Sequence, residues 1–345
     1  MKKLIIQFCL IFLFNSFYTS LALAQSEDSA VIIMYHRFGE EGFPTTNVKL
    51  SQFDQHIAEL SKDNYNIVPL RTIIEALKNK RALPPRTVAV TIDDGYLSIY
   101  KEAWPRLKAA GIPITLFIST ESVNDQNPSS MTWDQIRELD ADPLVEIGHH
   151  GHAHAHMTEI SNDEAKADIE EADKIYQREL GYIPDLFAYP YGEFSENMIE
   201  IAKSKNYEAA FAQYSSAVNS RNDIMALPRF AFNENYADID RFKLIINSRA
   251  LPVKDILPRT ADLDVNPPSV GFTVDDNIKG LGAMNCFPSH IDKAARINLI
   301  GTNRVEVRFD EPFPPGRSRI NCTMPGPDGR WYWFGLPFFR LNTVN

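Results

Sequence analysis

The feature that most constrains the fold is a regular alternation of short apolar runs with amphipathic stretches between residues 31 and 250. The apolar runs are rich in β-branched residues and predict strands, and the amphipathic stretches predict helices. Strands that alternate with helices pair in parallel, and about seven such units predict an irregular (β/α) barrel. The predicted strands are Val31–Tyr35, Asn66–Pro69, Thr87–Ile92, Ile114–Ile118, Val145–Gly148, Leu186–Tyr189 and Glu208–Phe211.

The helices are expected in the intervals between these strands. One of them begins with a capping box, Ser161 followed by Glu164, and Gly181 lies where that helix should end. The predicted helices are Ser51–Asp63, Leu70–Lys80, Tyr100–Ala110, Thr132–Leu139, Ser161–Leu180 and Ser195–Lys205.

The composition changes after residue 250. Residues 251–269 are rich in proline and predict a linker, and residues 270–345 are rich in glycine, proline and aromatic residues, which favours a small all-β, sandwich-like domain. Two cysteines fall in this last part, Cys286 and Cys322, and we predict that they form a disulfide. The sequence therefore predicts one large α/β domain, residues 25–250, followed by a linker and a small β domain.

Residues 1–24 have the pattern of a secretory signal peptide, with two lysines, a short apolar run, and Ala22 and Ala24 before the expected cleavage at Gln25. The apolar run is short for a membrane span, so we expect an exported protein, periplasmic or secreted, without an integral membrane segment. A retained anchor is the alternative. Loss of two lysines leaves 33 basic and 45 acidic residues, a net charge of −12, which argues against nucleic acid as a partner. The oligomeric state does not follow from the sequence.

Two adjacent carboxylates, Asp93 and Asp94, follow the predicted strand Thr87–Ile92 and precede Gly95. Parallel α/β folds place their active sites at the carboxyl ends of strands. Carboxylates beside a core are costly unless a positive charge lies next to them. The pair therefore predicts a metal ligand beside a general base, and a solvent-exposed turn is the alternative.

Five of the eight histidines lie between residues 149 and 156, directly after the predicted strand Val145–Gly148. His150 and His154 are four residues apart, a spacing that places two imidazoles on one side of a helical turn. His152 and His156 have the same spacing, so spacing alone leaves both pairs open. Two imidazoles and a carboxylate are the ligands of a catalytic zinc site. The alternative is a surface cluster that binds metals adventitiously.

A third motif is the turn Pro190-Tyr191-Gly192, which follows the predicted strand Leu186–Tyr189. Such a turn can present a backbone N–H to an anionic intermediate. On its own this signal is weak, because turns that combine an aromatic residue with proline are common.

The order of the three motifs resembles the polysaccharide deacetylases of carbohydrate esterase family 4, over residues 31–241. The resemblance implies that Asp93 is the general base and that Asp94, His150 and His154 bind a divalent metal ion. It also implies that Tyr191 contributes its backbone N–H to the oxyanion. His149, His152 and His156 then fall on variable positions.

The sequence departs from the family pattern at two places. Many family members carry an arginine just before the Pro-Tyr turn, where this chain has Ala188 and Tyr189. We take Arg229 as the candidate to orient Asp93 instead. The late Leu-x-His motif that supplies the general acid in the family also has no match.

The remaining histidines narrow the choice of the acid. His56 falls on a predicted polar helix and His290 in the predicted β domain, whereas His36 ends the first strand and should reach the mouth of the barrel. The segment Met34–Phe38 resembles the subgroup that acts on poly-N-acetylglucosamine-type exopolysaccharides, in which this histidine is the acid. A structural histidine is the alternative.

The expected function is metal-dependent hydrolysis of acetamido groups on an N-acetylated polysaccharide, such as poly-N-acetylglucosamine, a chitin-like polymer or the glycan of peptidoglycan. Zn²⁺ suits the predicted ligands best, and Co²⁺, Ni²⁺ or Mn²⁺ also fit. The alternatives are an esterase for O-acetyl groups of xylan and a non-catalytic glycan-binding module. The aromatic residues 331–334 can stack on sugars or form the core of the small domain, and its size favours the core.

Overall fold

The computed structural model describes residues 26–263 and 265–340. The predicted signal peptide, residues 1–24, lies outside the described residues. Among the helices of the described part, none is both long enough and apolar enough to cross a bilayer.

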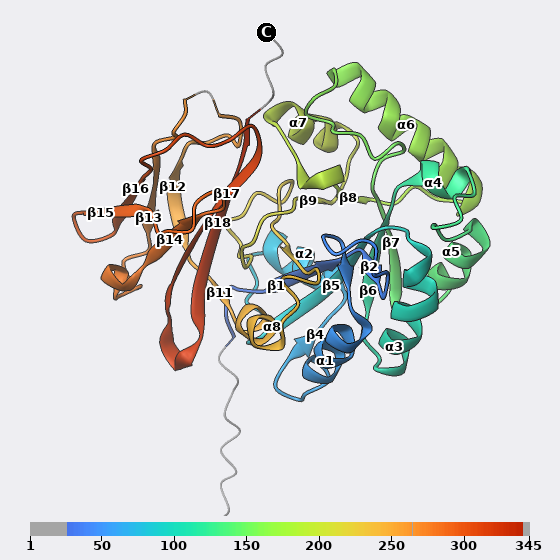
Figure 1. The fold of residues 1–345 in the computed structure, drawn as a ribbon, viewed down its shortest axis with the longest axis horizontal. Helices are drawn as coiled ribbons and strands as arrows, with labels where there is room; N and C mark the ends of the chain where they lie inside the picture. The colour runs from blue at the N-terminus through green and yellow to red at the C-terminus, as the bar shows by residue number, and fades with distance from the viewer. Residues whose placement is uncertain (1–25, 264, 341–345) are drawn as a thin grey trace, which may run out of the picture.

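The N-terminal part is built on a curled parallel sheet of eight strands (Figure 1). The strand order is β10-β1-β5-β6-β7-β8-β9, and β4 pairs with β5. The sheet confirms the predicted irregular (β/α) barrel, which is incomplete. Its strands are β1 Val31–Tyr35, β4 Asn66–Ile67, β5 Thr87–Asp94, β6 Ile114–Ile118, β7 Val145–His149, β8 Leu186–Ala188, β9 Ala209–Phe211 and β10 Phe230–Ala231.

Helices cover this sheet, as the alternation of patterns predicted. The central strands β1 and β6 are buried at every residue, which is why they contain almost no polar side chains. Two helices, Thr120–Asn124 (α4) and Ile239–Ile246 (α8), and the two-residue strand β10 were not predicted. The helices are α1 Leu50–Leu60, α2 Leu70–Lys78, α3 Trp104–Ala109 with the preceding π-helical turn Ile99–Ala103, α4 Thr120–Asn124, α5 Trp133–Asp140, α6 Asn162–Glu179, α7 Glu196–Ser204 and α8 Ile239–Ile246. The short strands β2 Arg37–Phe38 and β3 Asn47–Val48 form a separate pair.

The C-terminal part contains two four-stranded sheets with one apolar core, beside the barrel in Figure 1. Their pairings are antiparallel except for β11 with β18, so the predicted all-β character is confirmed. One sheet has the order β11 Arg249–Ala250, β18 Trp331–Arg340, β17 Gly316–Pro325 and β14 Asn285–Pro288. The other has the order β12 Val253–Leu257, β13 Val270–Val274, β16 Arg304–Arg308 and β15 Arg296–Ile300.

Three predictions for the C-terminal part can be compared with the structure. The predicted disulfide is confirmed, because Cys286 and Cys322 face each other on β14 and β17 and are bonded. The segment 251–269, predicted to be a linker, includes strand β12, which pairs with β13. The aromatic residues 331–334 divide between the two interpretations, since Phe334 is buried in the core and Trp331 is exposed.

The C-terminal sheets pack directly against the barrel. The Trp333 ring meets the Phe230 ring edge to face, with centroids 5.2 Å apart. The buried side chain of Arg330 donates to the carbonyl of Asn247 and pairs with Glu27 near the start of the described chain. Strand β18 and the residue before it therefore hold the C-terminal sheets against the barrel.

Candidate active site

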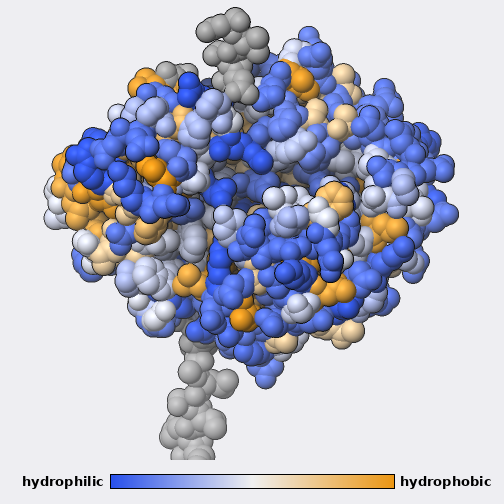
Figure 2. Space-filling model, in the orientation of Figure 1, coloured by the Kyte–Doolittle hydropathy of each residue, from blue (hydrophilic) through white to orange (hydrophobic). Residues whose placement is uncertain are grey.

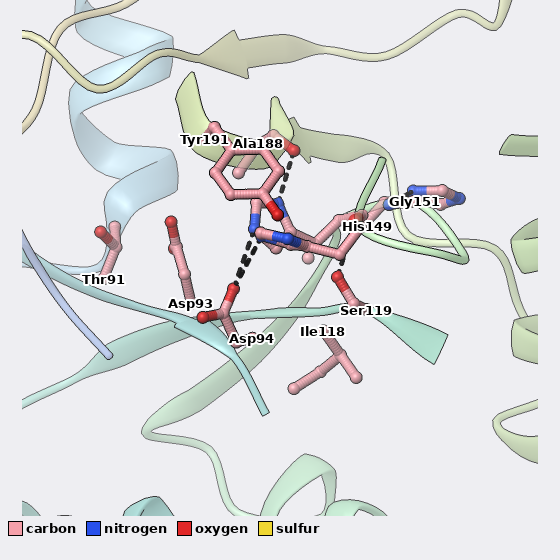
Figure 3. Close-up of polar contacts among 12 residues, drawn as sticks. Thr91, Asp93, Asp94, Ile118, Ser119, His149, Gly151, Ala188 and Tyr191 are labelled. Atoms are coloured by element: carbon pink, nitrogen blue, oxygen red, sulfur yellow. Dashed lines mark hydrogen bonds and ion pairs between the residues drawn. The ribbon is translucent and has the colours of Figure 1, made fainter. Parts of the chain in front are cut away.

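Three side chains converge at the carboxyl edge of the sheet. Asp94 ends β5, and His150 and His154 lie in the loop after β7. The Oδ1 atom of Asp94 is 3.3 Å from Nε2 of His150 and 3.2 Å from Nε2 of His154, and the two contacts are drawn in Figure 3. Of the two histidine pairs that spacing left open, the structure therefore places His150 and His154 around the carboxylate.

This geometry fits a metal ion. The Asp94 Oδ1 atom is buried and has no well-formed hydrogen bond among the described residues, although two imidazole nitrogens lie close to it. Two ligand atoms at about 2.0–2.1 Å from a tetrahedral zinc ion lie roughly 3.3 Å apart, which is the separation seen here. One carboxylate and two imidazoles are also the donor set of a catalytic site with open positions.

The ring of His150 is oriented by a hydrogen bond behind it. Its Nδ1 atom is 2.7 Å from the carbonyl oxygen of Ala188, at the end of β8. A carbonyl only accepts, so Nδ1 carries the proton and Nε2 keeps a lone pair toward Asp94. The hydroxyl of Ser119 also donates to the His150 carbonyl, at 2.9 Å. Residues at the ends of β6 and β8 thus fix this candidate ligand.

The carboxylate and the imidazoles of the cluster shift one another's pKa values. Burial alone would raise the pKa of Asp94, but the contacts with His150 and His154 hold it well below its usual range. Burial likewise opposes the charged form of His150, and Asp94 with Asp93 raises the pKa of that imidazole above its usual value. The negative charge that raises the pKa of His150 is the same charge that attracts a cation.

The other histidines of the loop have local partners. The buried ring of His149 accepts the N–H of Gly151, and His152 lies 2.9 Å from the hydroxyl of Thr120. His156 stacks on the ring of Tyr191, with centroids 3.7 Å apart. These contacts place the three side chains away from the Asp94 carboxylate.

Two acidic residues that the sequence analysis did not single out hold this part of the site in place. Asp168 on α6 accepts the backbone N–H groups of His152 and Ala153, both at 2.8 Å. Glu193 lies 2.9 Å from Nδ1 of His156. Each is one of many acids on polar stretches, and no local pattern distinguishes it from a solvent-exposed side chain.

Asp93 lies next to the cluster but has a different partner. Arg229, which precedes β10, donates to both of its carboxylate oxygens at 2.7 Å. Both residues are buried, and Arg229 also donates to the carbonyl of Ala212. The arginine expected to orient Asp93 therefore contacts it through two parallel hydrogen bonds, which fix the orientation of the carboxylate.

His36 follows β1 directly. The charges of Asp94, Asp93 and His150 contribute to the electrostatic environment of its imidazole. Its Nδ1 atom is buried and has no hydrogen-bond partner among the described residues. Burial lowers the pKa of His36, and the two aspartates act in the opposite direction. The structure thus brings His36 to the same site as the carboxylate pair.

His56, in contrast, is not a surface residue of a polar helix. It lies on the inner side of α1, where it is fully buried and stacks on Phe242 of α8 with ring centroids 3.8 Å apart. Its Nδ1 is 2.8 Å from the hydroxyl of Tyr35 and its Nε2 is 3.0 Å from the carbonyl of Ala237. The prediction missed this because α8, which covers the ring, was not predicted.

The Pro-Tyr-Gly turn lies over the cluster, with the Tyr191 ring 4.4 Å from that of His154 (Figure 3). Tyr191 has a φ of 58°, and Gly192 follows with a φ of 71°. A Cβ atom on Gly192 would lie 2.2 Å from the backbone nitrogen of Gln213, so only glycine fits there. Arg317 of β17 donates to the Tyr191 carbonyl at 2.5 Å, a contact that the sequence did not indicate.

One further side chain borders the cluster. Tyr96 interacts with Asp94, and burial together with that carboxylate raises the pKa of its phenol to about 12. The guanidinium of Arg37 lies over the Tyr96 ring, 3.4 Å from its centroid. The phenol therefore stays protonated at neutral pH and remains a hydrogen-bond donor beside the candidate metal ligands.

The fold and this cluster define an incomplete (β/α) barrel with a candidate metal site at its carboxyl edge. Residues 80–210 match the family model described as polysaccharide deacetylase. Over this segment the chain is therefore similar to polysaccharide deacetylases, and the segment contains the candidate ligands Asp94, His150 and His154.

Individual relatives agree with this similarity. The chain is 23% identical over 240 residues to the poly-β-1,6-N-acetyl-D-glucosamine N-deacetylase of Staphylococcus aureus, a match that covers 62% of this chain and 82% of that protein. Among solved structures it resembles the deacetylase PplD of Streptococcus pyogenes in complex with acetate, with a TM-score of 0.58, 20% identity, and coverage of 64% of this chain and 99% of that one. It also resembles IcaB from Ammonifex degensii, with a TM-score of 0.54, 24% identity, and coverage of 63% and 97%. At these identities the two structures show the fold.

Proposed function

We propose that the protein is a metal-dependent polysaccharide N-deacetylase, which hydrolyses acetamido groups of an N-acetylated glycan to acetate and free amines. One observation carries the proposal. The three candidate ligands Asp94, His150 and His154 converge while Asp93 stands beside them with a separate cationic partner. This divides the two adjacent carboxylates between metal binding and proton transfer.

The bound ion and Asp93 have complementary tasks in this proposal. A divalent cation held by the three ligands would polarise the acetyl carbonyl and lower the pKa of a bound water from 15.7 toward about 7, and zinc suits these ligands best. Asp93 accepts the proton of the attacking water. Arg229 holds the Asp93 carboxylate in a fixed orientation, because the pair is buried and doubly hydrogen-bonded.

The remaining site residues act on the oxyanion intermediate and on the leaving amine. The backbone N–H of Tyr191 stabilises the oxyanion, a contribution of about 3–4 kcal/mol in other hydrolases. His36 protonates the leaving amine as the carbon–nitrogen bond breaks, so that the free amino sugar leaves. For that step the imidazole must carry a proton, which the nearby Asp93 and Asp94 favour and burial opposes.

We infer a poly-N-acetylglucosamine-type substrate. The relative from Staphylococcus aureus, whose name gives poly-β-1,6-N-acetyl-D-glucosamine as its substrate, supports this inference. We further propose that residues 1–24 direct export and are removed, so that the enzyme meets its polymer outside the cytoplasm. Residues 25–250 would then carry the chemistry, and residues 270–345 would be the accessory domain.

Acetate release from three substrates tests this proposal. The zinc-loaded protein should release acetate from poly-N-acetylglucosamine and chitin oligomers, with little release from acetylxylan. Asp93→Asn should lower kcat by about 10²–10⁴-fold without loss of metal. Asp134→Asn, at an exposed position, is the matched control and should behave as wild type. Near-normal turnover of a folded, metal-loaded Asp93→Asn protein would remove Asp93 as the base, and preference for acetylxylan would make the protein an O-acetyl esterase.

A further inference from the structure

A furrow separates the barrel from the C-terminal sheets, and strongly hydrophilic residues line it in Figure 2. It contains two adjoining cavities of about 280 and about 460 Å³, which share several lining residues. We call this feature the furrow and define it by Ser215, Tyr236, Arg241, Arg317, Arg319 and Trp331. Every one of these residues lies outside the segment 80–210 that matches the family model.

Strand β17 supplies two of the arginines through its regular alternation. Its even-numbered residues from Ser318 to Met324 are buried on the side of the sandwich core. Its odd-numbered residues therefore point to the opposite face, toward the barrel. Arg317 and Arg319 are the first two of them, and α8 contributes Arg241 from the other side of the furrow.

Two of the three arginines have no acidic partner. Arg317 lies 3.4 Å from Glu193, whereas no carboxylate of the described residues comes within 4.0 Å of the side-chain nitrogens of Arg241 or Arg319. The Nε atom of Arg319 is buried without any hydrogen-bond acceptor among those residues. Two cations thus share a partly enclosed cavity in a chain with a net charge of −10.

The arginines also perturb one another. Burial lowers the pKa of Arg241 to about 10, and Arg319 contributes to the decrease. Burial and the neighbouring Arg317 lower the pKa of Arg319 in the same way. Both side chains keep their charge at neutral pH, so their mutual repulsion is a free-energy cost of the folded state that a bound anion would remove.

The position of the furrow favours a polymer over a free ion. The smaller cavity reaches Arg229, the partner of Asp93, and so adjoins the catalytic residues. The larger cavity is bordered by aromatic side chains, among which Tyr236, Phe287 and Trp331 are exposed. A chain of sugars that leaves the catalytic site along this path would meet the arginines first and the aromatic faces next.

We infer that the furrow binds a negatively charged glycan, whose acidic group pairs with Arg241 and Arg319 while its sugar rings stack on the aromatic residues. The inference rests on the proposed deacetylase function and refines it. The natural substrate would then be a polymer of the poly-N-acetylglucosamine type that also carries acidic substituents, in addition to its neutral acetamido sugars. Arginine suits this task because its planar guanidinium matches the two oxygens of a carboxylate.

The test is a calorimetric binding measurement on full-length, zinc-loaded protein carrying Asp93→Asn, which prevents turnover. The probe is a hyaluronan tetrasaccharide, in which glucuronate alternates with N-acetylglucosamine. Its carboxyl-reduced form keeps every linkage and removes the charge. We expect the charged form to bind at least 10-fold more tightly in 50 mM salt, and we expect this advantage to shrink in 500 mM salt.

The arginines are tested in the same background. Arg241→Gln and Arg319→Gln should each lower the ratio of charged to neutral affinity by at least 5-fold. Arg296→Gln, which removes an exposed arginine of the same part of the chain, should leave that ratio unchanged. A chondroitin 6-sulfate tetrasaccharide distinguishes sulfate from carboxylate, and arginine-dependent binding of either supports an acidic-group site.

The outcomes separate this inference from the proposed function. Equal affinity for the charged and neutral forms, or a ratio that both arginine variants leave intact, would overturn the furrow site even if wild-type protein releases acetate from chitin oligomers. Failure to release acetate from any substrate would overturn the proposed function, and arginine-dependent binding of the charged probe would then still support the site.

Discussion

The candidate active site and the furrow use arginine in opposite ways. Arg229 is buried with Asp93 and makes two hydrogen bonds to it, so that each charge compensates the other. Arg241 and Arg319 face a cavity, with no carboxylate of the described residues in reach. In the candidate active site, the arginine already has its carboxylate partner. In the furrow, by our inference, the two arginines gain an acidic partner only when a ligand binds.

Replacement of Arg229 should have the largest effect. Arg229→Met leaves the Asp93 carboxylate buried without its partner, which should lower the free energy of unfolding by about 3–5 kcal/mol. Denaturant unfolding measures the loss, and Arg296→Met, at an exposed pair, should change stability by about 0.5 kcal/mol or less. Adding Asp93→Asn to Arg229→Met should recover part of the loss. An Arg229→Met protein as stable as wild type would show that the buried pair is not compensated as described.

Removal of the disulfide should affect the β part more than the site. Cys286 and Cys322 are 36 residues apart, and opening a loop of that size should cost about 2–4 kcal/mol of stability. We expect the double Ser variant to unfold its C-terminal sheets at lower denaturant while zinc content stays at the wild-type level. Hydrogen exchange resolves the two parts. Equal loss of protection in the barrel strands would contradict a stabilisation local to the sandwich.

Acid should destabilise the protein through His56. Burial lowers the pKa of His56 to about 4, against about 6.5 in an unfolded chain, so the unfolded state binds more protons between these values. Its contribution to stability is therefore fully present above pH 6.5 and is lost as pH falls toward 4, by up to about 3 kcal/mol. His56→Gln should flatten this part of the pH profile, because its amide can still donate to the Ala237 carbonyl. If the free energy of unfolding of His56→Gln falls with pH as steeply as that of wild type, His56 is not the group responsible.

The smallest predicted effect is a gain in stability, not a loss. Arg319→Gln removes a cation that faces other cations, so it should raise the free energy of unfolding by roughly 0.5–1 kcal/mol in the absence of ligand. Thermal or denaturant unfolding at low salt measures the change, and the gain should fade at high salt. A loss of stability would mean that Arg319 has a structural partner and that the two regions do not differ as we describe.

Much of the barrel is readable from the sequence because its signals are local. Strands β1 and β6 have the predicted bounds, since continuous apolar runs flanked by polar residues mark buried parallel strands. Asp94 and His150 each follow such a run, and the carboxyl ends of parallel strands meet at one edge. Their convergence with His154 could therefore be anticipated, although spacing alone did not choose between the two histidine pairs.

What the sequence did not reveal depends on contacts between distant segments. Strand β10 has two residues, too few for a periodic signal, and helix α8 lies beyond the last strand that was predicted for the barrel; both pack into the barrel core. His56 lies on the helix that was predicted for it, but its burial was missed for the same reason. The furrow lies between β17 and α8. No local sequence pattern shows that the arginines of these two elements line the same cavity.

The most direct test of the account is a metal titration of four variants. Asp94→Asn, His150→Ala and His154→Ala should each lower zinc affinity at least 10-fold relative to wild type, and acetate release should fall with it. Asp93→Asn should bind zinc as wild type does and still fail to turn over substrate. If Asp93→Asn loses zinc as the other three do, or if those three retain full affinity, the division of tasks between the two adjacent carboxylates is wrong.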